Sequence, residues 1–424
     1  MFDHRSLKNQ ILTAGKSIGL NKGDLHVLAR DPFFVGTDKD YDDANWVSEL
    51  WARMMAKRKT PLHLRGFHYW VQSQAIPKTD GQIYAYKDAQ KDWNYMLRAV
   101  QIARYLGIGD WHSLVDMKHP NPKDFDKYLV GAGIGKAGDV DIKRQLDDKL
   151  EGLEDELLRD LVNCSPQYKT DGYQTYHLEV LCEKNSMGFV IEPACKKYGA
   201  CYQAFIGQAS VEKIDMMSMR AIKAARVGKK VRIFYIADFD RYGWSMVTAV
   251  ARKIEFTLMQ CGIKRADVKL TRLALNEDHI KKFKLPMAPK NGEAVVELDA
   301  LEAIHPGELG KMVNNALKPY FDKDTPKLVD VENRRMRQAV LKMLEDNLRV
   351  PLDTALLGVD IEEVDTVAKE LDLASVIDKN YAPPVPTHIY DDSAGNWVLD
   401  TGRGYWAQFK AYKAYKGDRV EEKA

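Results

Sequence analysis

Three acidic residues follow two apolar segments whose pattern predicts β-strands. The segment "VRIFYIADFD" (231–240) is mostly apolar until it reaches Asp238 and Asp240, and Gly243 follows three residues later. The earlier segment "YHLEVLCEK" (176–184) ends at Glu183. Alternate residues of a strand point the same way, and ligands bind at the carboxyl ends of parallel strands. We therefore expect the three carboxylates to converge at one edge of a sheet.

These carboxylates form an all-oxygen ligand set, which suits Mg²⁺ better than zinc. Mg²⁺ held by a few carboxylates is the usual arrangement for phosphoryl chemistry. The plainer alternative is that each acid is solvated or salt-bridged at its strand end. Clustered carboxylates repel one another unless a cation lies between them. The sequence thus predicts Mg²⁺ as cofactor, with Glu183, Asp238 and Asp240 as its ligands.

The elements that must position these acids alternate between strand and helix. From residue 174 to about 277, apolar strand patterns alternate with amphipathic helix patterns, and Gly228 and Gly262 close two of the helices. Such alternation predicts an α/β domain, a parallel sheet covered on both faces. The pattern loosens after this region, and we expect a helical C-terminal extension.

The region before the sheet is mostly helical. Its order of helix, helix, strand and helix between residues 43 and 111 is typical of a winged-helix module. A stretch rich in proline and glycine follows, and then an acidic amphipathic helix. The predicted domains are a winged-helix DNA-binding domain (1–118), a linker with a bridging helix (119–170), the sheet domain (171–320) and the helical extension (321–424).

Charge is nearly balanced over the whole chain, with 63 Lys and Arg against 61 Asp and Glu. Residues 50–79, however, contain no acidic residue. A local basic patch of this kind is what phosphate contacts require, although a solvated basic helix end is the simpler reading. The basic residues of this window are Arg53, Lys57, Arg58, Lys59, Arg65 and Lys78.

Cysteine usage and hydropathy bear on the compartment. The chain has five cysteines, an odd number, and no C-x-x-C pair, which is typical of reduced thiols. The first residues have no apolar segment of a signal peptide, and no run approaches the ~20 apolar residues of a membrane span. We expect a cytoplasmic protein, associated with the nucleoid if it binds DNA, without membrane contact.

A glutamate ending one strand and a D-x-D ending a later one is similar to the Toprim signature of topoisomerases, bacterial primases and some nucleases. "CEKNSM" (182–187) resembles the glutamate-lysine segment of topoisomerase VI A subunits and of the related meiotic double-strand-break protein. "IADFDRYGWSM" (236–246) resembles their D-x-D-P-Y-G segment, with Arg241 in place of proline. The resemblance implies a winged-helix domain followed by a Toprim-type sheet.

In that family the winged helix carries a nucleophilic tyrosine in an R-[DE]-x-[YF]-Y motif. "LHLRGFHYW" (62–70) resembles it, with Gly66 and His68 as departures. The resemblance places Tyr69 on the catalytic tyrosine and Arg65 on the arginine, which could stabilise transition-state charge. A winged-helix tyrosine in the core or on the DNA backbone is the alternative, and His68 is a candidate proton acceptor.

The resemblance implies a type II DNA topoisomerase of the A-subunit kind, which breaks DNA through Tyr69 with help from Arg65 and Glu183. It implies double-stranded DNA as substrate, a homodimer and a separate ATPase subunit. A Toprim endonuclease that hydrolyses DNA with water is an alternative, as is a non-catalytic DNA-binding subunit of a larger complex. The DNA contacts we expect are Arg53, Lys57, Arg58, Lys59 and Lys184.

Three weaker signals leave their alternatives open. Glu297 and Asp299 could join the metal site, but capping of the following helix is favoured. Arg220 could reach DNA, but an exposed salt bridge is favoured. The aromatic residues between positions 405 and 415 could stack on DNA, but their helical spacing favours a packed amphipathic helix.

Overall fold

The computed structural model describes most of the chain. The described residues are 2–56, 58, 60–84, 89–111, 113–115, 120–125, 174–205, 211–263, 266–290, 293–356 and 388–417. The predicted linker and bridging helix lie almost wholly outside them. None of the helices in these ranges is long and apolar enough to cross a membrane.

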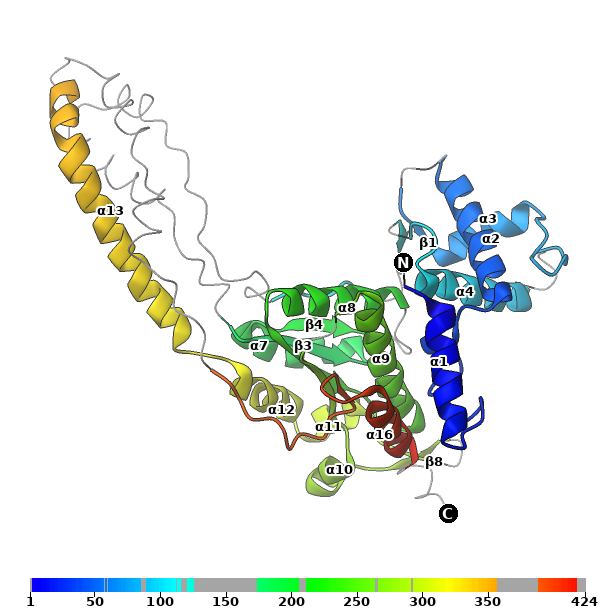
Figure 1. Ribbon diagram of the computed structural model, residues 1–424. Helices are drawn as coiled ribbons and strands as arrows, with labels where there is room; N and C mark the ends of the chain where they lie inside the picture. The colour runs from blue at the N-terminus through cyan, green and yellow to red at the C-terminus, as the bar shows by residue number, and fades with distance from the viewer. Residues whose placement is uncertain are drawn as a thin grey trace.

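The N-terminal region is built from helices (Figure 1). They are α1 (His4–Ser17), the 3₁₀ turn η1 (Pro32–Phe34), α2 (Asp38–Met55), α3 (Leu64–Ser73) and α4 (Ala89–Leu106). Thr37 and Asp40 form a capping box that starts α2, as the acidic sequence there favours. The short strands β1 (Leu62–His63) and β2 (Leu114–Val115) pair in parallel beside α3. An antiparallel bridge between Pro77 and Ile83 is the described part of the strand expected near residue 83. The helical content matches the expectation, and the winged-helix assignment itself stays a prediction.

The central sheet confirms the predicted parallel α/β architecture. Its order is β4 (Cys201–Ala204), β3 (Tyr176–Cys182), β5 (Lys230–Ile236), β6 (Val268–Ala274) and β9 (Leu399–Asp400). The strands from β4 to β6 run parallel, and β9 pairs antiparallel with β6. The four parallel strands fall in the four segments that the sequence pattern predicts.

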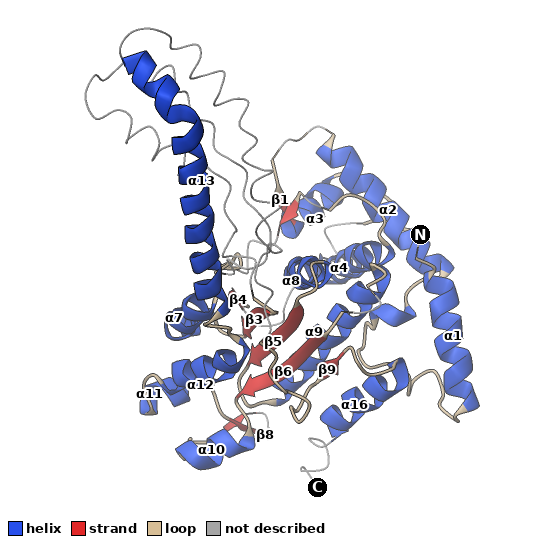
Figure 2. Ribbon diagram, turned by 60° about the vertical axis from the view of Figure 1, so that its left-hand side comes forward, coloured by secondary structure: helices blue, strands red, loops and turns tan. Residues whose placement is uncertain are grey.

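Helices cover both faces of the sheet (Figure 2). The helices α8 (Val211–Arg226) and α9 (Arg241–Gln260) share one hydrophobic core with Ile233 of β5. The helices α7 (Gly188–Tyr198) and α12 (Glu308–Leu317) share the other core with Phe234. Because successive strand residues point to opposite faces, an almost unbroken apolar strand such as β5 can serve both cores.

Further elements, most of them short, complete the fold around the carboxyl edge of the sheet and beyond it. They are η4 (Asn185–Met187), α10 (Glu277–Phe283), β7 (Ala288–Lys290), β8 (Glu293–Val295), α11 (Leu298–Ile304), η5 (Lys318–Tyr320), α13 (Thr325–Leu356) and α16 (Tyr405–Gly417). The helix α13 projects away from the sheet in Figures 1 and 2.

The C-terminal region is more than the helical extension that the sequence predicts. β9 adds an edge strand to the sheet, so the sheet domain does not end at residue 320. α16 packs on α9, with Phe409 and Tyr412 buried in the core of that face. The buried Arg252 of α9 contacts Tyr405 and also Asp31, so it joins the C-terminal helix to the N-terminal segment. The packed amphipathic helix is thus the correct alternative for the tail aromatics.

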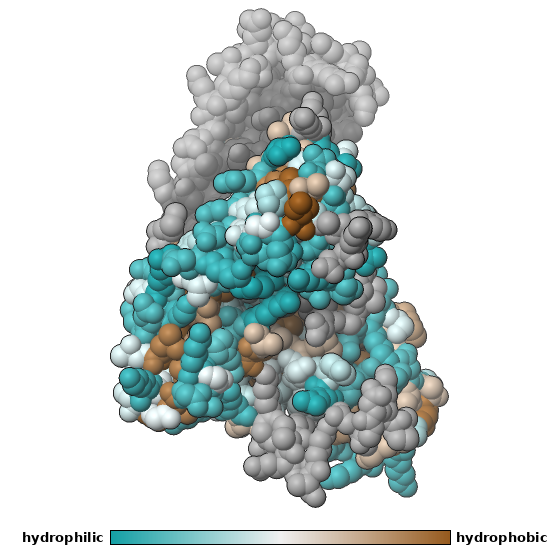
Figure 3. Space-filling model, turned by 90° about the vertical axis from the view of Figure 1, so that its right-hand side faces the viewer, coloured by the Kyte–Doolittle hydropathy of each residue, from teal (hydrophilic) through white to brown (hydrophobic). Residues whose placement is uncertain are grey.

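The face of the molecule in Figure 3 is mostly hydrophilic, and its hydrophobic residues gather in small, separate patches. Scattered apolar residues of this kind are normal on a protein surface. The figure therefore points to no large apolar docking area among the residues coloured on that face.

Candidate functional site: an acidic cluster at the carboxyl edge of the sheet

Glu183 and Asp238 are brought together by the pairing of β3 with β5. Cys182 lies opposite Ile236 in this parallel register, so the residues that follow each strand emerge side by side. The Glu183 amide donates to the Ile236 carbonyl at 2.9 Å. The Asp238 amide donates to Glu183 Oε2 at 3.3 Å. The predicted convergence of these two acids at the sheet edge is confirmed.

Asp240 and Gly243 shape the turn between β5 and α9. Asp240 caps α9, and its Oδ1 accepts from the Gly243 amide at 2.6 Å. A Cβ atom on Gly243 would lie 2.3 Å from the Asp238 carbonyl oxygen, closer than any side chain can come. The glycine of the D-x-D-x-x-G pattern is therefore required by the close approach of backbone to backbone.

A second segment, residues 296–299, is joined to this turn. Phe239 and Val296 exchange two backbone hydrogen bonds, of 2.8 and 3.1 Å. The Leu298 amide, at the start of α11, donates to Asp238 Oδ1 at 2.8 Å. This segment therefore holds the Asp238 carboxylate, while Glu183 accepts from the Asp238 amide.

Lys184 connects the two segments by charge. Its Nζ lies 3.2 Å from Asp238 Oδ2 and 3.1 Å from Glu297 Oε2, and it also donates to Asp299. Burial lowers the pKa of Lys184, but these three carboxylates outweigh burial and raise it above its usual value. The favoured expectation that Glu297 or Asp299 caps α11 is wrong, because Glu297 occupies the cap position without a side-chain hydrogen bond.

Arg272 of β6 belongs to the site, and sequence reasoning missed it. Its guanidinium donates to the backbone carbonyl of Asp238 and lies 3.8 Å from the centre of the Trp244 ring. The residue is only 8% exposed. The available signal was an arginine within the apolar strand pattern "DVKLTRLALN" (267–276), since a cation there needs a nearby partner.

Burial and like charge disturb the titration of the acids. The pKa of Glu183 is raised to about 7, chiefly by burial and then by the charges of the neighbouring Asp238 and Asp240. Burial also raises the pKa of Asp238, against the opposing effects of the Leu298 amide and Lys184. The charges of Glu183, Asp238 and Asp240 therefore oppose one another, and a bound cation would relieve this repulsion.

The donor set fits a hydrated Mg²⁺. The oxygens of Glu183, Asp238 and Asp240 are hard ligands, and Mg²⁺ keeps several waters and binds through only one or two carboxylates. The three side chains do not form a closed cage. Among the described residues, one group of three His, Cys, Asp or Glu side chains has ligand atoms that all lie within 4.8 Å of one another, namely His177, Glu179 and Cys201. The ligand atoms of Glu183, Asp238 and Asp240 lie farther apart than this.

That second group is a buried ion pair rather than a metal site. Arg220 donates to both oxygens of Glu179, at 2.7 and 2.8 Å, and His177 lies 2.9 Å from the same carboxylate. Burial raises the pKa of Glu179, but Arg220 outweighs it and holds the pKa at about 2. Arg220 therefore forms a salt bridge, as expected, but the salt bridge is buried and not exposed.

Tyr69 lies on the outer face of α3. Its side chain is 53% exposed, and Arg65, one turn earlier, is exposed beside it on the same face. His68 is buried and hydrogen-bonded to Tyr84, so it does not accept the Tyr69 proton in this arrangement. Burial lowers the pKa of His68, which keeps the ring neutral.

The predicted basic patch is only partly available. Arg53 and Arg58 are exposed, and Arg53 lies 5.9 Å from the Trp70 ring centre. Lys57 and Lys59 lie outside the described residues. Lys78 is buried and paired with Asp92 at 2.9 Å, so its assignment to the patch is wrong.

Tyr69 and the acids lie in different parts of the molecule. Asp240 caps the first residue of α9, whereas Gln260 at its last turn donates to the Tyr105 carbonyl of α4. A helix of 20 residues spans about 30 Å. Figures 1 and 2 both place α3 on the opposite side of the molecule from α10 and β8, which flank the acids.

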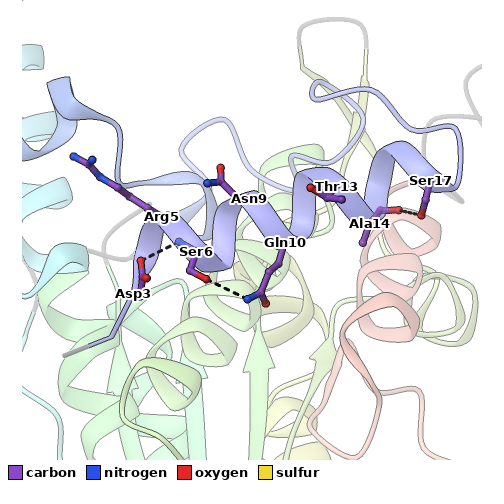
Figure 4. A pocket seen from close by; sticks show the side chains of 8 residues that line it. All are labelled: Asp3, Arg5, Ser6, Asn9, Gln10, Thr13, Ala14 and Ser17. Carbon is purple, nitrogen blue, oxygen red and sulfur yellow. Dashed lines mark hydrogen bonds between the residues drawn. The ribbon is translucent and has the colours of Figure 1, made fainter.

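An open pocket of about 730 Å³ lies on α1, away from the acids (Figure 4). Several of its polar groups are paired within the helix, as in the 2.9 Å bond from the Ser6 amide to Asp3 and the 3.2 Å bond from Gln10 to Ser6, and Arg5 pairs with Asp38 of α2. One helix lines it, so we read it as a solvated helix face. The lining residues are Asp3, Arg5, Ser6, Asn9, Gln10, Thr13, Ala14 and Ser17.

Comparison with protein-family models and with curated proteins gave no match to this chain.

Proposed function

We propose that this chain is a Mg²⁺-dependent DNA-cleaving enzyme of the topoisomerase VI A kind, with a winged-helix domain before a Toprim-type sheet. One observation carries the proposal. The parallel pairing of β3 with β5 brings Glu183 to within 3.3 Å of the Asp238 amide, in an acidic cluster with Asp240. The motif resemblance supplies the rest of the argument.

The bound metal would supply Lewis-acid neutralisation of phosphate oxygens at the acids. Glu183, with a pKa of about 7, can accept or give a proton near neutral pH at the sugar oxygen of the cleaved bond. Lys184 adds a fixed positive charge, and Arg53 and Arg58 offer exposed cations to the DNA backbone.

Tyr69 is the proposed nucleophile, with Arg65 beside it. The phenolic oxygen gives up its proton to solvent and attacks phosphorus, the sugar oxygen leaves and takes a proton from Glu183, and the phosphotyrosyl bond conserves the energy of the broken bond. The separation of α3 from the acids supports a homodimer in which Tyr69 of one copy acts at the acids of the other. The separate ATPase partner rests on the resemblance alone.

The same separation favours a second candidate, a hydrolytic Toprim endonuclease. In that enzyme water attacks the phosphodiester at the acids, and Tyr69 serves only DNA binding. A non-catalytic DNA-binding subunit is the remaining possibility if the acids bind Mg²⁺ without chemistry.

The test is cleavage of supercoiled plasmid by purified protein with Mg²⁺, stopped with SDS and analysed with and without proteinase K. Protein-linked breaks that disappear in Tyr69→Phe support the tyrosine mechanism. Protein-free breaks that survive Tyr69→Phe support the hydrolytic enzyme. If the wild type and Asp238→Asn both bind DNA and neither cleaves it, both enzyme mechanisms are contradicted, unless an added ATPase subunit restores cleavage by the wild type.

A further inference from the structure

Lys184 is held by three carboxylates from two separate parts of the chain. Asp238 comes from the turn after β5, whereas Glu297 and Asp299 come from the start of α11. The Lys184 side chain is 22% exposed and that of Asp238 is 10% exposed, while the other two acids are about half exposed. The lysine therefore lies between a buried proposed metal ligand and a more exposed acidic pair.

The acidic pair has a fixed position relative to Asp238. The Phe239–Val296 bridge and the hydrogen bond from Leu298 to Asp238 attach the 296–299 segment directly to the acidic turn. The pair cannot move away from the turn without breaking the Phe239–Val296 backbone bonds and the bond from the Leu298 amide to the Asp238 carboxylate. A lysine on a flexible stem, in contrast, can shift between carboxylates that all lie within about 4 Å of it.

An ammonium group beside Asp238 competes with any other cation for that carboxylate. Mg²⁺ at Asp238 must repel Lys184, since two like charges close together in a partly buried site raise each other's free energy. Glu297 and Asp299 offer the lysine two other partners, both about half exposed. Their charge thus lowers the cost of moving the lysine off Asp238.

We propose that Lys184 is a built-in counter-cation of the acidic cluster, and that Glu297 and Asp299 are positioning residues that retain it when Mg²⁺ binds at Asp238. This inference rests on the proposed function, because it takes Asp238 as a metal ligand. It deepens that function by assigning a role to three side chains that flank the metal ligands.

The two kinds of substitution then have opposite effects on Mg²⁺ affinity. Lys184→Met removes the competitor and tightens Mg²⁺ binding, by roughly twofold to fivefold for a partly exposed pair. The double variant Glu297→Gln/Asp299→Asn leaves Lys184 with Asp238 alone and weakens Mg²⁺ binding by a similar factor. Direct loss of negative charge would also weaken binding, so a third variant is needed.

The experiment is isothermal titration of Mg²⁺ into the full chain without DNA, for wild type, Lys184→Met, the acid-pair variant and the triple variant. If Glu297 and Asp299 act through Lys184, the triple variant should differ from Lys184→Met by less than about twofold in Mg²⁺ affinity. Circular dichroism of each variant checks the fold.

Two results would overturn the inference, and they differ from failure of the proposed function. Unchanged or weaker Mg²⁺ binding in Lys184→Met would refute the competition. The second result is that Glu297→Gln/Asp299→Asn weakens Mg²⁺ binding as strongly in the Lys184→Met background as in the wild type. In that case Glu297 and Asp299 act on the metal directly, as ligands or as long-range charges. Wild-type binding that is lost in Asp238→Asn establishes the site in either case, whereas no wild-type binding at all removes both the site and this inference.

Discussion

Glu183 is a residue whose position opposes its own ionisation. Its carboxylate is partly buried beside Asp238 and Asp240, and its pKa is raised to about 7 from an ordinary value near 4.5. The folded protein therefore holds a proton on Glu183 more tightly than the unfolded chain does. Between about pH 4.5 and pH 7, the free energy of unfolding therefore falls as pH rises. Above pH 7 the folded protein bears the whole destabilisation caused by the ionised Glu183.

The first prediction is that Glu183→Gln stabilises the protein at high pH. At pH 8 without Mg²⁺, the free energy of unfolding should rise by about 1–3 kcal/mol, because the amide carries no charge to desolvate. At pH 4 both states of the wild type are protonated, and the gain should vanish. Urea unfolding at the two pH values measures the difference.

Glu49→Gln, an exposed substitution on α2, is the control and should show no pH-dependent gain. A Glu183→Gln gain that is equal at pH 4 and pH 8 would contradict the raised pKa. The destabilisation of the wild type at pH 8, relative to Glu183→Gln, should become smaller in millimolar Mg²⁺, since a bound cation relieves the repulsion among the acids.

The second prediction concerns Gly243. Gly243→Ala puts a Cβ atom 2.3 Å from the Asp238 carbonyl, so the turn must shift. We expect a loss of about 1–3 kcal/mol of stability and a loss of Mg²⁺ binding at Asp238. Thermal unfolding and titration with Mg²⁺ measure the two effects. Gly404→Ala, where a Cβ meets no atom within 4 Å, is the control and should keep both properties.

At the scale of elements, the face between β3 and α8 is held by a buried ion pair. Glu179 and Arg220 are joined by two hydrogen bonds in a setting where Glu179 is fully buried. Removing one partner of such a pair leaves an uncompensated charge, whereas replacing both by apolar residues is often nearly neutral.

The third prediction follows from this asymmetry. Arg220→Met should cost about 3–5 kcal/mol, and Glu179→Met with Arg220→Met should recover most of that loss. Urea unfolding of the two single variants and the double variant gives the coupling energy. If the double variant were as unstable as Arg220→Met alone, His177 or the apolar packing would outweigh the ion pair.

The 296–299 segment is the second element that decides the site. Its backbone bonds to Phe239 and Asp238 join α11 to the turn that starts α9. Three elements therefore converge on Asp238: the end of β5, the start of α11 and the side chain of Arg272 from β6. A carboxylate held from several sides is positioned more rigidly than one on a free loop.

At the scale of the whole molecule, α9 runs from the Asp240 turn to α4, and Figures 1 and 2 place α3, which carries Tyr69, well apart from α11 beside Asp238. A tyrosine that acts at the acids must then come from a second copy of the chain. The separation and the proposed homodimer lead to a test that uses two inactive variants together.

The fourth prediction is complementation in trans. Tyr69→Phe and Glu183→Gln should each fail to form protein-linked breaks when purified alone. After mixing and exchange of subunits, the mixed dimer holds one intact pair of Tyr69 and Glu183, and protein-linked single-strand nicks should appear. Plasmid nicking stopped with SDS measures them. Continued absence of nicks in dimers shown to have exchanged would contradict action between copies.

The alternation of strands and helices from residue 174 onward was predictable, because hydrophobic periodicity is a local property of the chain. It was enough to place Glu183 and Asp238 at one edge of a parallel sheet. The same local pattern identified α16 as a packed amphipathic helix from the spacing of its aromatic residues.

The partners of charged side chains were not predictable in the same way. Lys78 and His68 stand in segments that resemble exposed functional helices, yet one pairs with Asp92 and the other with Tyr84 inside the N-terminal region. Burial of a polar side chain depends on which distant residue lies opposite it.

By itself, the sequence determined the α/β sheet, the paired acids and the glycine that lets their turn close, since each depends on neighbouring residues and strand order. Only the tertiary structure decided that Lys184 meets Glu297 and Asp299 more than 110 positions along the chain, as their separations of 113 and 115 show. It likewise decided that Arg272 supports Asp238 and that Tyr69 lies far from the acids. These relations arise from packing between distant segments, which the periodicity of the side chains along the chain does not predict.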